Sequence, residues 1–423
     1  MSYFVIQGGS KLLGSIPVYG SKNAAMPLLA ATLLTREPIV LKNVPPILDV
    51  KHMVEILSAL GAKVEVSDMQ VAVTAEHVRP QDLPVTLVGR LRGSILLLGA
   101  LLGRCRTIRM PRPGGDIIGA RPIDVHLDGL VQLGATITED GDFVAINGEA
   151  MKPGRVVLSE FSVTATENIL LVAATLPGTT IIEIAAAEPH VIALCELLQA
   201  MGATITGAGT HTISITGSAT LRGATFTNIP DMLEAGLFLL IGAATQSELT
   251  VEHVPLGHLR LFFKKFDDIG VHYEVEWEDK EEYLARVTVK PSALKSFKVQ
   301  TLPYPGIATD LQAPFSVIAT QVTGSSLIHD PMYEGRFKYA TELQKMGANV
   351  TVCDPHRVII TGPTPLVGRR IPSLDIRAGA TLLMAGLVAK GETIIDEAEI
   401  IDRGYANLLD RLQAIGAKIT RKE

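Results

Sequence analysis

The sequence predicts an α/β protein that is built from six copies of one helix–strand unit. Six segments share an apolar–Gly–small signature followed by alternating apolar and polar residues, as in L-G-A-K-V-E-V at 60–66 and M-G-A-N-V-T-V at 346–352. The signature glycines are Gly61, Gly134, Gly202, Gly270, Gly347 and Gly416, at successive spacings of 73, 68, 68, 77 and 69 residues. This period is longer than that of a solenoid repeat, so it indicates six compact supersecondary modules.

Composition supports this class and excludes several others. The chain has 423 residues, of which 47% are hydrophobic and 19% charged, and its formal net charge is −6, which argues against a nucleic-acid binder. Cys105, Cys195 and Cys353 lie far apart, which excludes a disulfide framework and a cysteine zinc site. No signal peptide, membrane span, metal-ligand spacing or cofactor motif is recognised. We therefore expect a cytoplasmic protein that uses no cofactor and no metal.

Each unit begins with an apolar helix that is rich in small residues. These helices are expected at 23–34, 93–102, 166–176, 232–244, 311–322 and 378–390. Almost no charge lies on them, so each should be buried on all sides. A short strand follows, as at 39–41, 180–182 and 393–395, and then an amphipathic helix, as at 50–59 and 405–414. The signature glycine caps that second helix, and one or two alternating strands, as at 63–66 and 70–73, close the unit.

Six units divide naturally into two domains of three. The polar turns at 19–21 and 227–231 are the expected seams. One domain would span residues 22–229, and the second would combine residues 1–21 with 230–423. We expect the active site in the cleft between them.

One glycine-rich stretch, R-P-G-G-D-I-I-G-A-R-P-I-D-V-H-L-D at 112–128, carries candidate chemistry. Its prolines and glycines predict a loop with Asp116 at the tip, and Arg121-Pro122 is expected to begin an amphipathic helix. A mobile loop with one carboxylate, followed by an arginine at a helix start, suits closure over an anionic ligand. An ordinary surface turn that leads into a helix is the alternative.

Polar residues recur where the helices of each unit begin, and helix N-termini attract anions. Before the apolar helices stand Lys22, Asn23, Arg92, Ser162, Thr164, Asp231, Asp310 and Arg377, and near the second helices stand Asp49, Arg121, Glu188, His190, His258, Arg336 and Arg403. Helix capping alone would explain Asn23, Ser162, Asp231 and Asp310. Lys22, Arg92 and Arg377 are poor caps, which favours a ligand with several negative groups. For Arg121, Arg336 and Arg403 a structural ion pair is the alternative. Two carboxylates, Asp116 and Asp310, suit proton removal and delivery on either side of such a ligand.

Six motifs, spread over essentially the whole chain, resemble the enolpyruvyl transferase family, and within it the members that act on UDP-N-acetylglucosamine. They are G-S-K-N-A-A at 20–25, P-G-G-x-x-I-G-A-R-P-x-D-x-H at 113–126, Y-P-G-x-x-T-D-x-Q-A at 304–313, Y-E-G-R-F at 333–337, D-I-R-A at 375–378 and I-D-R-G-Y at 401–405. The resemblance implies two inside-out α/β barrel-like domains. It also implies transfer of enolpyruvate from phosphoenolpyruvate to the sugar 3′-hydroxyl, with release of phosphate, by addition and elimination.

The resemblance also implies roles for individual residues. Lys22, Arg121 and Arg403 would hold phosphoenolpyruvate, with Arg92 lining the same region and Arg336 and Arg377 near its carboxylate. Asn23 and Asp310 would contact the sugar hydroxyl, with Asp310 as proton acceptor. The uridine diphosphate part would be held by Pro122, Asp124, His126, Ser162, Val163 and Thr164, and further substrate contacts would come from Met332, Glu334 and Asp375. Asp116, Lys22, Asp310 and Arg403 would carry the catalysis.

Asp116 departs from the usual pattern, because most of the family has cysteine at this loop position. A free thiol is mostly protonated at neutral pH and a free aspartic acid is not, so Asp116 needs a raised pKa to deliver a proton. We expect a more acidic pH optimum than that of a cysteine form, and resistance to fosfomycin, which alkylates the thiol. Two alternatives stay open: a sister enzyme with another hydroxyl acceptor, and a non-catalytic paralogue that binds sugar nucleotides.

Overall fold

The computed structural model describes residues 2–112 and 122–423 of the chain. These residues form two compact units. We call residues 20–112 and 122–229 the inserted unit, and residues 2–19 and 230–423 the terminal unit. The predicted active-site cleft stays a prediction.

The inserted unit is built around three buried helices that the sequence predicts. These central helices are α1 (Lys22–Ala31), α4 (Leu96–Cys105) and α6 (Val163–Ala173). Helix α4 contacts both α1 and α6, and the outer elements cover the faces that remain. Helix α6 is buried from Ala165 to Ala173, as expected for a helix without a polar face.

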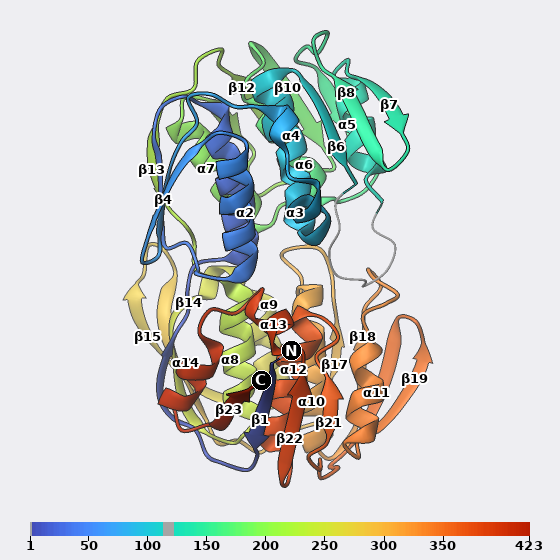
Figure 1. Ribbon diagram of the computed structural model, residues 1–423. Coiled ribbons are helices and arrows are strands. Elements are labelled where there is room, and N and C mark those ends of the chain that lie inside the picture. The colour runs from blue at the N-terminus through green and yellow to red at the C-terminus, as the bar shows by residue number, and fades with distance from the viewer. Residues whose placement is uncertain (1, 113–121) are drawn as a thin grey trace. The chain divides into compact units, whose positions relative to one another are not determined.

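Further helices and three small sheets surround this centre (Figure 1). The other helices are α2 (Leu48–Ala59), α3 (Val85–Arg90), α5 (Asp124–Gln132), α7 (Pro189–Ala200) and the 3₁₀ helices η1 (Thr32–Leu34), η2 (Pro80–Asp82) and η3 (Arg92–Ile95). The strand orders are β13 (Ala224–Thr227), β3 (Ile39–Lys42), β5 (Gln70–Thr74), β4 (Lys63–Ser67); β6 (Thr107–Pro111), β8 (Phe143–Asn147), β7 (Thr136–Asp140); and β11 (Thr204–Thr206), β12 (Thr212–Gly217), β10 (Gly178–Glu183), β9 (Arg155–Val157).

The terminal unit repeats the plan around α8 (Met232–Ala244), α10 (Gln312–Gln321) and α12 (Ile376–Val388). Its other helices are α9 (Arg260–Ile269), α11 (Lys338–Lys345), α13 (Ala398–Asp402), α14 (Leu408–Ala414), η4 (Leu256–His258) and η5 (Thr309–Leu311). The strand orders are β15 (His272–Asp279), β16 (Leu284–Lys290), β14 (Glu248–Pro255), β2 (Leu13–Pro17); β17 (Lys298–Gln300), β18 (Gly324–His329), β20 (Arg357–Gly362), β19 (Asn349–Asp354); and β21 (Arg370–Pro372), β22 (Glu392–Asp396), β1 (Tyr3–Gln7), β23 (Lys418–Lys422).

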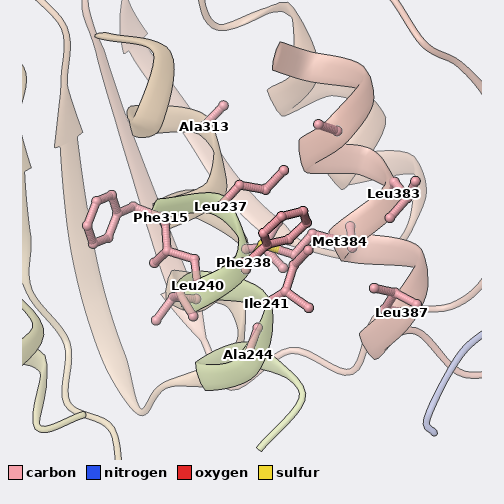
Figure 2. Packing of buried hydrophobic residues seen from close by; sticks show 14 of the residues in the cluster. Leu237, Phe238, Leu240, Ile241, Ala244, Ala313, Phe315, Leu383, Met384 and Leu387 are labelled. Atoms are coloured by element: carbon pink, nitrogen blue, oxygen red, sulfur yellow. The ribbon is translucent and has the colours of Figure 1, made fainter. Parts of the chain in front are cut away.

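The core of the terminal unit lies where its three central helices meet (Figure 2). Phe238 of α8, Phe315 of α10 and Met384 of α12 are fully buried there. Full burial of one such side chain contributes about 1.5–3 kcal/mol, so this apolar contact is the main force that holds the helices together.

The signature glycines end the outer helices, as the sequence predicts. All six have positive φ angles, from 86° to 116°, a region that only glycine adopts without strain. After α2, the Gly61 N–H donates to Ser58 O (3.0 Å) and the Ala62 N–H donates to Leu57 O (3.1 Å), which is a Schellman motif. The repeated sequence signature therefore marks the C-terminus of an outer helix in each unit.

Several predicted helix boundaries are wrong by a few residues; the helix expected at 166–176, for example, is α6 (Val163–Ala173). Helix α5 begins at Asp124 rather than at Arg121-Pro122, and the carboxylate of Asp124 in its first turn favours that start. The helix expected at 405–414 begins at Leu408, because Asn407 adopts a left-handed conformation with φ of 47°.

Within residues 2–112 and 122–423, the chain passes between the units near residues 19–20 and 229–230, and these two segments are hydrogen-bonded to each other. The Ser21 N–H donates to Ile229 O (2.7 Å), and the Asp231 N–H donates to Tyr19 O (2.9 Å). The backbone segments that lead into and out of the inserted unit are therefore paired with each other. Among the helices within the described ranges, none is long and apolar enough to cross a membrane.

Candidate functional site

Asp310 lies at the centre of an ion-pair cluster in the terminal unit. It belongs to the 3₁₀ turn η5, directly before α10. Its Oδ1 accepts from Arg336 Nη2 at 2.6 Å, and its Oδ2 accepts from Arg377 Nε at 2.9 Å. Both arginine side chains are more than 90% buried, whereas the side chain of Asp310 is 19% exposed. Two cationic side chains thus converge on the carboxylate of Asp310.

The electrostatics of this cluster keep Asp310 ionised. Burial opposes ionisation, but Arg336 and Arg377 outweigh it and hold the pKa of Asp310 well below its usual range. Burial also raises the pKa of Tyr405 to about 12, so its hydroxyl stays protonated. That hydroxyl accepts from Arg377 Nη1 at 2.9 Å.

The starts of the three central helices of the terminal unit lie close together. Asp310 precedes α10 and contacts Arg377 in the first turn of α12. Asp231, the N-cap of α8, interacts electrostatically with Arg377 as well. The three helix starts thus converge in this unit, and their positive ends add to the charge of the arginines.

The loop before Arg336 is held by a fully buried carboxylate. Asp330 accepts from Thr309 Oγ1 and, through Oδ1, from the Met332 N–H at 3.0 Å. Met332 and Glu334 are exposed. The guanidinium carbon Cζ of Arg336 lies over the ring of Tyr333, 5.4 Å from the ring centroid. The loop therefore anchors Arg336 beside Asp310. Arg403 follows α13, half-buried, as its C-cap residue.

In the inserted unit, Lys22 is the first residue of α1 and forms an ion pair with Asp49 (2.6 Å). Asp49 is in the first turn of α2 and is buried, so the pair fixes the Lys22 ammonium between two helix starts. Arg92 begins η3 and is half-buried. Next to it, Gly93 packs closely against α1, since a Cβ on Gly93 would lie only 3.0 Å from Sδ of Met26. Lys22 and Arg92 thus belong to adjoining helix starts.

His126 joins two further helix starts of the inserted unit. It is buried in the first turns of α5. Its Nε2 lies 3.2 Å from Thr164 Oγ1, in the first turn of α6, and its Nδ1 lies 2.8 Å from Asn168 Nδ2. Burial, with a smaller effect from the charge of Arg92, lowers the pKa of His126 to about 3, so the imidazole is neutral. It can therefore act as a hydrogen-bonding group but not as an acid near neutral pH.

Helix capping explains some of the predicted site residues but not others. Ser162 caps α6 by accepting from the Ala165 N–H (3.4 Å), and Asp231 caps α8 by accepting from the Leu233 N–H (2.8 Å). Asn23 and Asp310 are not N-caps, so capping does not explain them; Ser21 caps α1 instead. Asp375 caps α12 and accepts from the backbone of Arg377 (2.8 Å).

Two predicted site residues, Asp116 and Arg121, lie outside the described residues. Pro122 and Asp124 are exposed, and Val163 is half-buried beside Ser162 and Thr164. Within the two described ranges, no cluster of three or more His, Cys, Asp or Glu residues could hold a metal ion.

The sequence interpretation missed Asn168, which contacts His126 from inside the buried helix α6. A signal was present in the sequence, because Thr166, Glu167 and Asn168 form a polar run in an otherwise apolar helix. A buried polar side chain requires a hydrogen-bond partner, so such a run indicates a specific contact.

Comparison with known proteins shows similarity over the full length of the chain. The family model described as EPSP synthase (3-phosphoshikimate 1-carboxyvinyltransferase) matches residues 6–412. The chain is 42% identical over 421 residues to UDP-N-acetylglucosamine 1-carboxyvinyltransferase 2 of Carboxydothermus hydrogenoformans, covering 100% of this chain and 99% of the relative. It is 40% identical over 425 residues to UDP-N-acetylglucosamine 1-carboxyvinyltransferase of Koribacter versatilis, covering 100% and 96%.

Solved structures share the fold. The enolpyruvyl transferase NikO from Streptomyces tendae matches with a TM-score of 0.88 and 26% identity, covering 100% of this chain and 99% of the other. EPSP synthase from Acinetobacter baumannii matches with a TM-score of 0.76 and 20% identity, covering both chains completely. These matches confirm the predicted fold class.

Proposed function

Because this chain belongs to the UDP-N-acetylglucosamine 1-carboxyvinyltransferases of the enolpyruvyl transferase family, we propose that it transfers enolpyruvate from phosphoenolpyruvate to the 3′-hydroxyl of UDP-N-acetylglucosamine. The reaction releases phosphate and is the first committed step in making peptidoglycan precursors. The observation that carries this proposal is the identity of about 40% to relatives of that name along the whole chain. We assign the reaction to the cytoplasm.

The reaction proceeds by addition followed by elimination. The sugar oxygen bonds to C2 of phosphoenolpyruvate while the methylene carbon gains a proton, which gives a tetrahedral ketal. The ketal then expels phosphate, and a proton leaves the methyl group to restore the double bond. Fixed cations stabilise the charges that develop, so a cluster such as that around Asp310 supports this chemistry.

We assign the binding of phosphoenolpyruvate to Lys22, Arg92, Arg121 and Arg403, with Arg336 and Arg377 at its carboxylate. The uridine diphosphate part is assigned to Pro122, Asp124, His126, Ser162, Val163 and Thr164. Asn23 and Asp310 contact the sugar hydroxyl in this proposal, and Met332, Glu334 and Asp375 add substrate contacts. These residues come from both units, so we propose that the domains of residues 22–229 and of 1–21 plus 230–423 act on the same substrates.

Asp310 is the proposed acceptor of the hydroxyl proton, and substrate binding would increase its basicity. In the structure its two arginines hold its pKa low, which makes it a weak base. The carboxylate of phosphoenolpyruvate would neutralise part of their charge, so the two arginines would stabilise the anionic form of Asp310 less. Asp116 is the proposed donor of the proton to the methylene carbon.

One alternative acceptor is favoured by a specific observation. The matching family model is described by an enzyme that acts on a phosphorylated shikimate. Shikimate 3-phosphate is therefore the competing acceptor, and both enzymes would release phosphate from phosphoenolpyruvate.

The test measures phosphate release from phosphoenolpyruvate with UDP-N-acetylglucosamine, with shikimate 3-phosphate and with neither. It compares the wild type with Asp116→Ala and with Glu160→Gln, an exposed control. We expect release only with the sugar nucleotide, unchanged in the control and lost in Asp116→Ala. Release with shikimate 3-phosphate alone would contradict the proposed acceptor. Sugar-dependent release that survives in Asp116→Ala would keep the reaction and remove Asp116 from catalysis.

A further inference from the structure

Asn168 connects two central helices of the inserted unit through its side-chain amide. Its Oδ1 accepts from the backbone N–H of Gly99 in α4 at 2.8 Å, and its Nδ2 donates to Ile95 O at 3.1 Å. The second hydrogen of Nδ2 points to His126 Nδ1 at 2.8 Å. Asn168 is fully buried, so all three contacts are made without competition from water.

The backbone of α4 fixes the orientation of this amide. If the amide were rotated by 180°, its NH₂ group would face the Gly99 N–H, and its oxygen would face the Ile95 carbonyl and lose both bonds. A side chain at position 99 would block the approach, because a Cβ there would lie 2.6 Å from Asn168 Oδ1. The glycine therefore allows α6 to come close enough for Asn168 to bond to the backbone.

This orientation decides which nitrogen of His126 carries the proton. Asn168 Nδ2 is a donor, so His126 Nδ1 must accept and carries no proton. The single proton of the neutral ring is then on Nε2, which donates to Thr164 Oγ1 (3.2 Å). Because Thr164 Oγ1 accepts from the imidazole, the hydroxyl keeps its own hydrogen available for another acceptor.

We propose that Asn168 is a positioning residue that holds His126 as its Nε2–H tautomer, so that the Thr164 hydroxyl donates to an oxygen of the uridine diphosphate part of the substrate. The inference rests on the proposed function for the identity of that ligand. Thr164 is half-buried in the first turn of α6, where the helix end also favours an electron-rich oxygen. The opposite tautomer would use the Thr164 hydrogen in a bond to Nε2 and would leave two donors, His126 Nδ1–H and Asn168 Nδ2–H, facing each other.

The first measurement is the ¹⁵N spectrum of histidine-labelled wild type near neutral pH, with His126 assigned by comparison with His126→Gln. We expect a protonated Nε2 and an unprotonated Nδ1. A proton on Nδ1, alone or with one on Nε2, would overturn the inference. This measurement needs no variant of Asn168 and so does not depend on how that variant folds.

The second measurement is a double-mutant cycle on KM for UDP-N-acetylglucosamine. It is made at about pH 9, where imidazole is neutral even with an ordinary pKa. Asn168→Asp gives His126 Nδ1 an acceptor and so moves the proton there. We expect Asn168→Asp and Thr164→Val each to raise KM about tenfold, as the loss of one hydrogen bond implies, with KM for phosphoenolpyruvate unchanged.

The double variant should be no worse than either single variant, because both remove the same donated hydrogen. Thr164→Ser keeps the hydroxyl and should raise KM less than Thr164→Val does. Thr32→Val, which removes the buried hydrogen bond from Thr32 Oγ1 to Leu29 O elsewhere in the unit, is the control for lost stability. Independent, multiplying effects of the two variants would overturn the inference.

The failure of the proposed function has a different signature. In that case the wild type would show the Nε2–H tautomer but neither bind nor turn over UDP-N-acetylglucosamine. That result would overturn the function and, with it, the role of Thr164 toward this ligand. A wild type that turns over the nucleotide sugar but has Nδ1 protonated would overturn only the role of Asn168.

Discussion

At Asp310 one carboxylate balances two arginines, both of which are more than 90% buried. Removal of one partner from a buried ion pair costs more than the pair contributes, because a charge is left without compensation in a poorly hydrated place. Asp310 therefore has a structural role in addition to the proposed chemical one. The two roles predict different results for different substitutions.

Asp310→Asn should destabilise the terminal unit by about 3–5 kcal/mol, because it removes the charged carboxylate that both Arg336 and Arg377 contact. Urea denaturation at neutral pH measures the loss. The double variant Asp310→Asn with Arg336→Gln should regain part of the stability while activity stays lost. Equal stability of the single and double variants would contradict the ion-pair explanation.

The same cluster predicts how stability depends on acid. The folded pKa of Asp310 is lowered, so its contribution is present above the unfolded value of 3.8 and is lost as pH falls below it. In Asp310→Asn this part of the acid dependence should be missing. Denaturation midpoints of the wild type and the variant should thus converge toward low pH.

Asp116 should make the enzyme insensitive to fosfomycin, because a carboxylate lacks the thiol that this drug alkylates in the family. Asp116→Cys should become sensitive, with time-dependent loss of activity and one covalent adduct by mass spectrometry. The exposed Cys353 is the internal control, since the wild type carries it and should still keep its activity. Time-dependent inactivation of the wild type would contradict the prediction.

At this scale the sequence indicated candidate residues but did not predict their contacts. Lys22, Arg92 and Arg377 stood out because a cation at a helix start is locally unfavourable. The contacts of Asp310 with residues 26 and 67 positions away could not be predicted, because periodicity carries no information on which distant side chains meet. The contact of Asn168 with His126 was not predicted for the same reason.

Among the elements, helix α6 contains an unusual buried acid. Glu167 is 1% exposed, and its Oε1 has no hydrogen-bond partner in the part of the chain that the structure describes. Burial, together with the negative charge of Glu188, raises its pKa well above the ordinary value. A raised pKa stabilises the fold below the unfolded value of 4.5, and this contribution is lost as pH rises.

Glu167→Gln should therefore stabilise the protein relative to the wild type, increasingly so as pH rises. The difference should grow by at most about 1.4 kcal/mol for each pH unit above 4.5. Urea denaturation at about pH 5, 6 and 7 measures it. Glu160→Gln, an exposed site just before the same helix, should show no such trend. A parallel trend in both variants would count against a buried neutral Glu167.

The sequence was most informative about the secondary-structure elements. Apolar helices without a polar face and glycines with positive φ are local requirements, and each recurs six times. The start of α5 was misplaced because Pro122 is acceptable both inside and before a first turn. A helix start that depends on one left-handed residue other than glycine, such as Asn407 before α14, is harder to predict from the sequence.

On the scale of the whole molecule, the first strand lies in the middle of the last sheet. Strand β1 pairs antiparallel with both β22 and β23, so segments from the two ends of the sequence complete one sheet. The strands of the inserted unit, by contrast, find all their partners between residues 39 and 227. The two units should therefore differ in their dependence on the C-terminal segment.

Deletion of residues 418–423 removes β23 and should unfold the terminal unit while the inserted unit stays folded. Limited proteolysis should then leave a resistant fragment close to residues 20–229. The matched control is a deletion of only residue 423, which lies beyond β23. Simultaneous loss of both units would contradict this independence.

The position of β1 also has a consequence for biosynthesis. Gln7 faces Glu392, which is added to the growing chain 385 residues later. At about 5–20 residues per second, the ribosome needs on the order of half a minute to make that partner. Until then Y-F-V-I-Q is an apolar strand with two unpaired edges, the kind of segment that invites aggregation. The nascent chain, more than the finished protein, is thus the form in which this molecule should depend on chaperones.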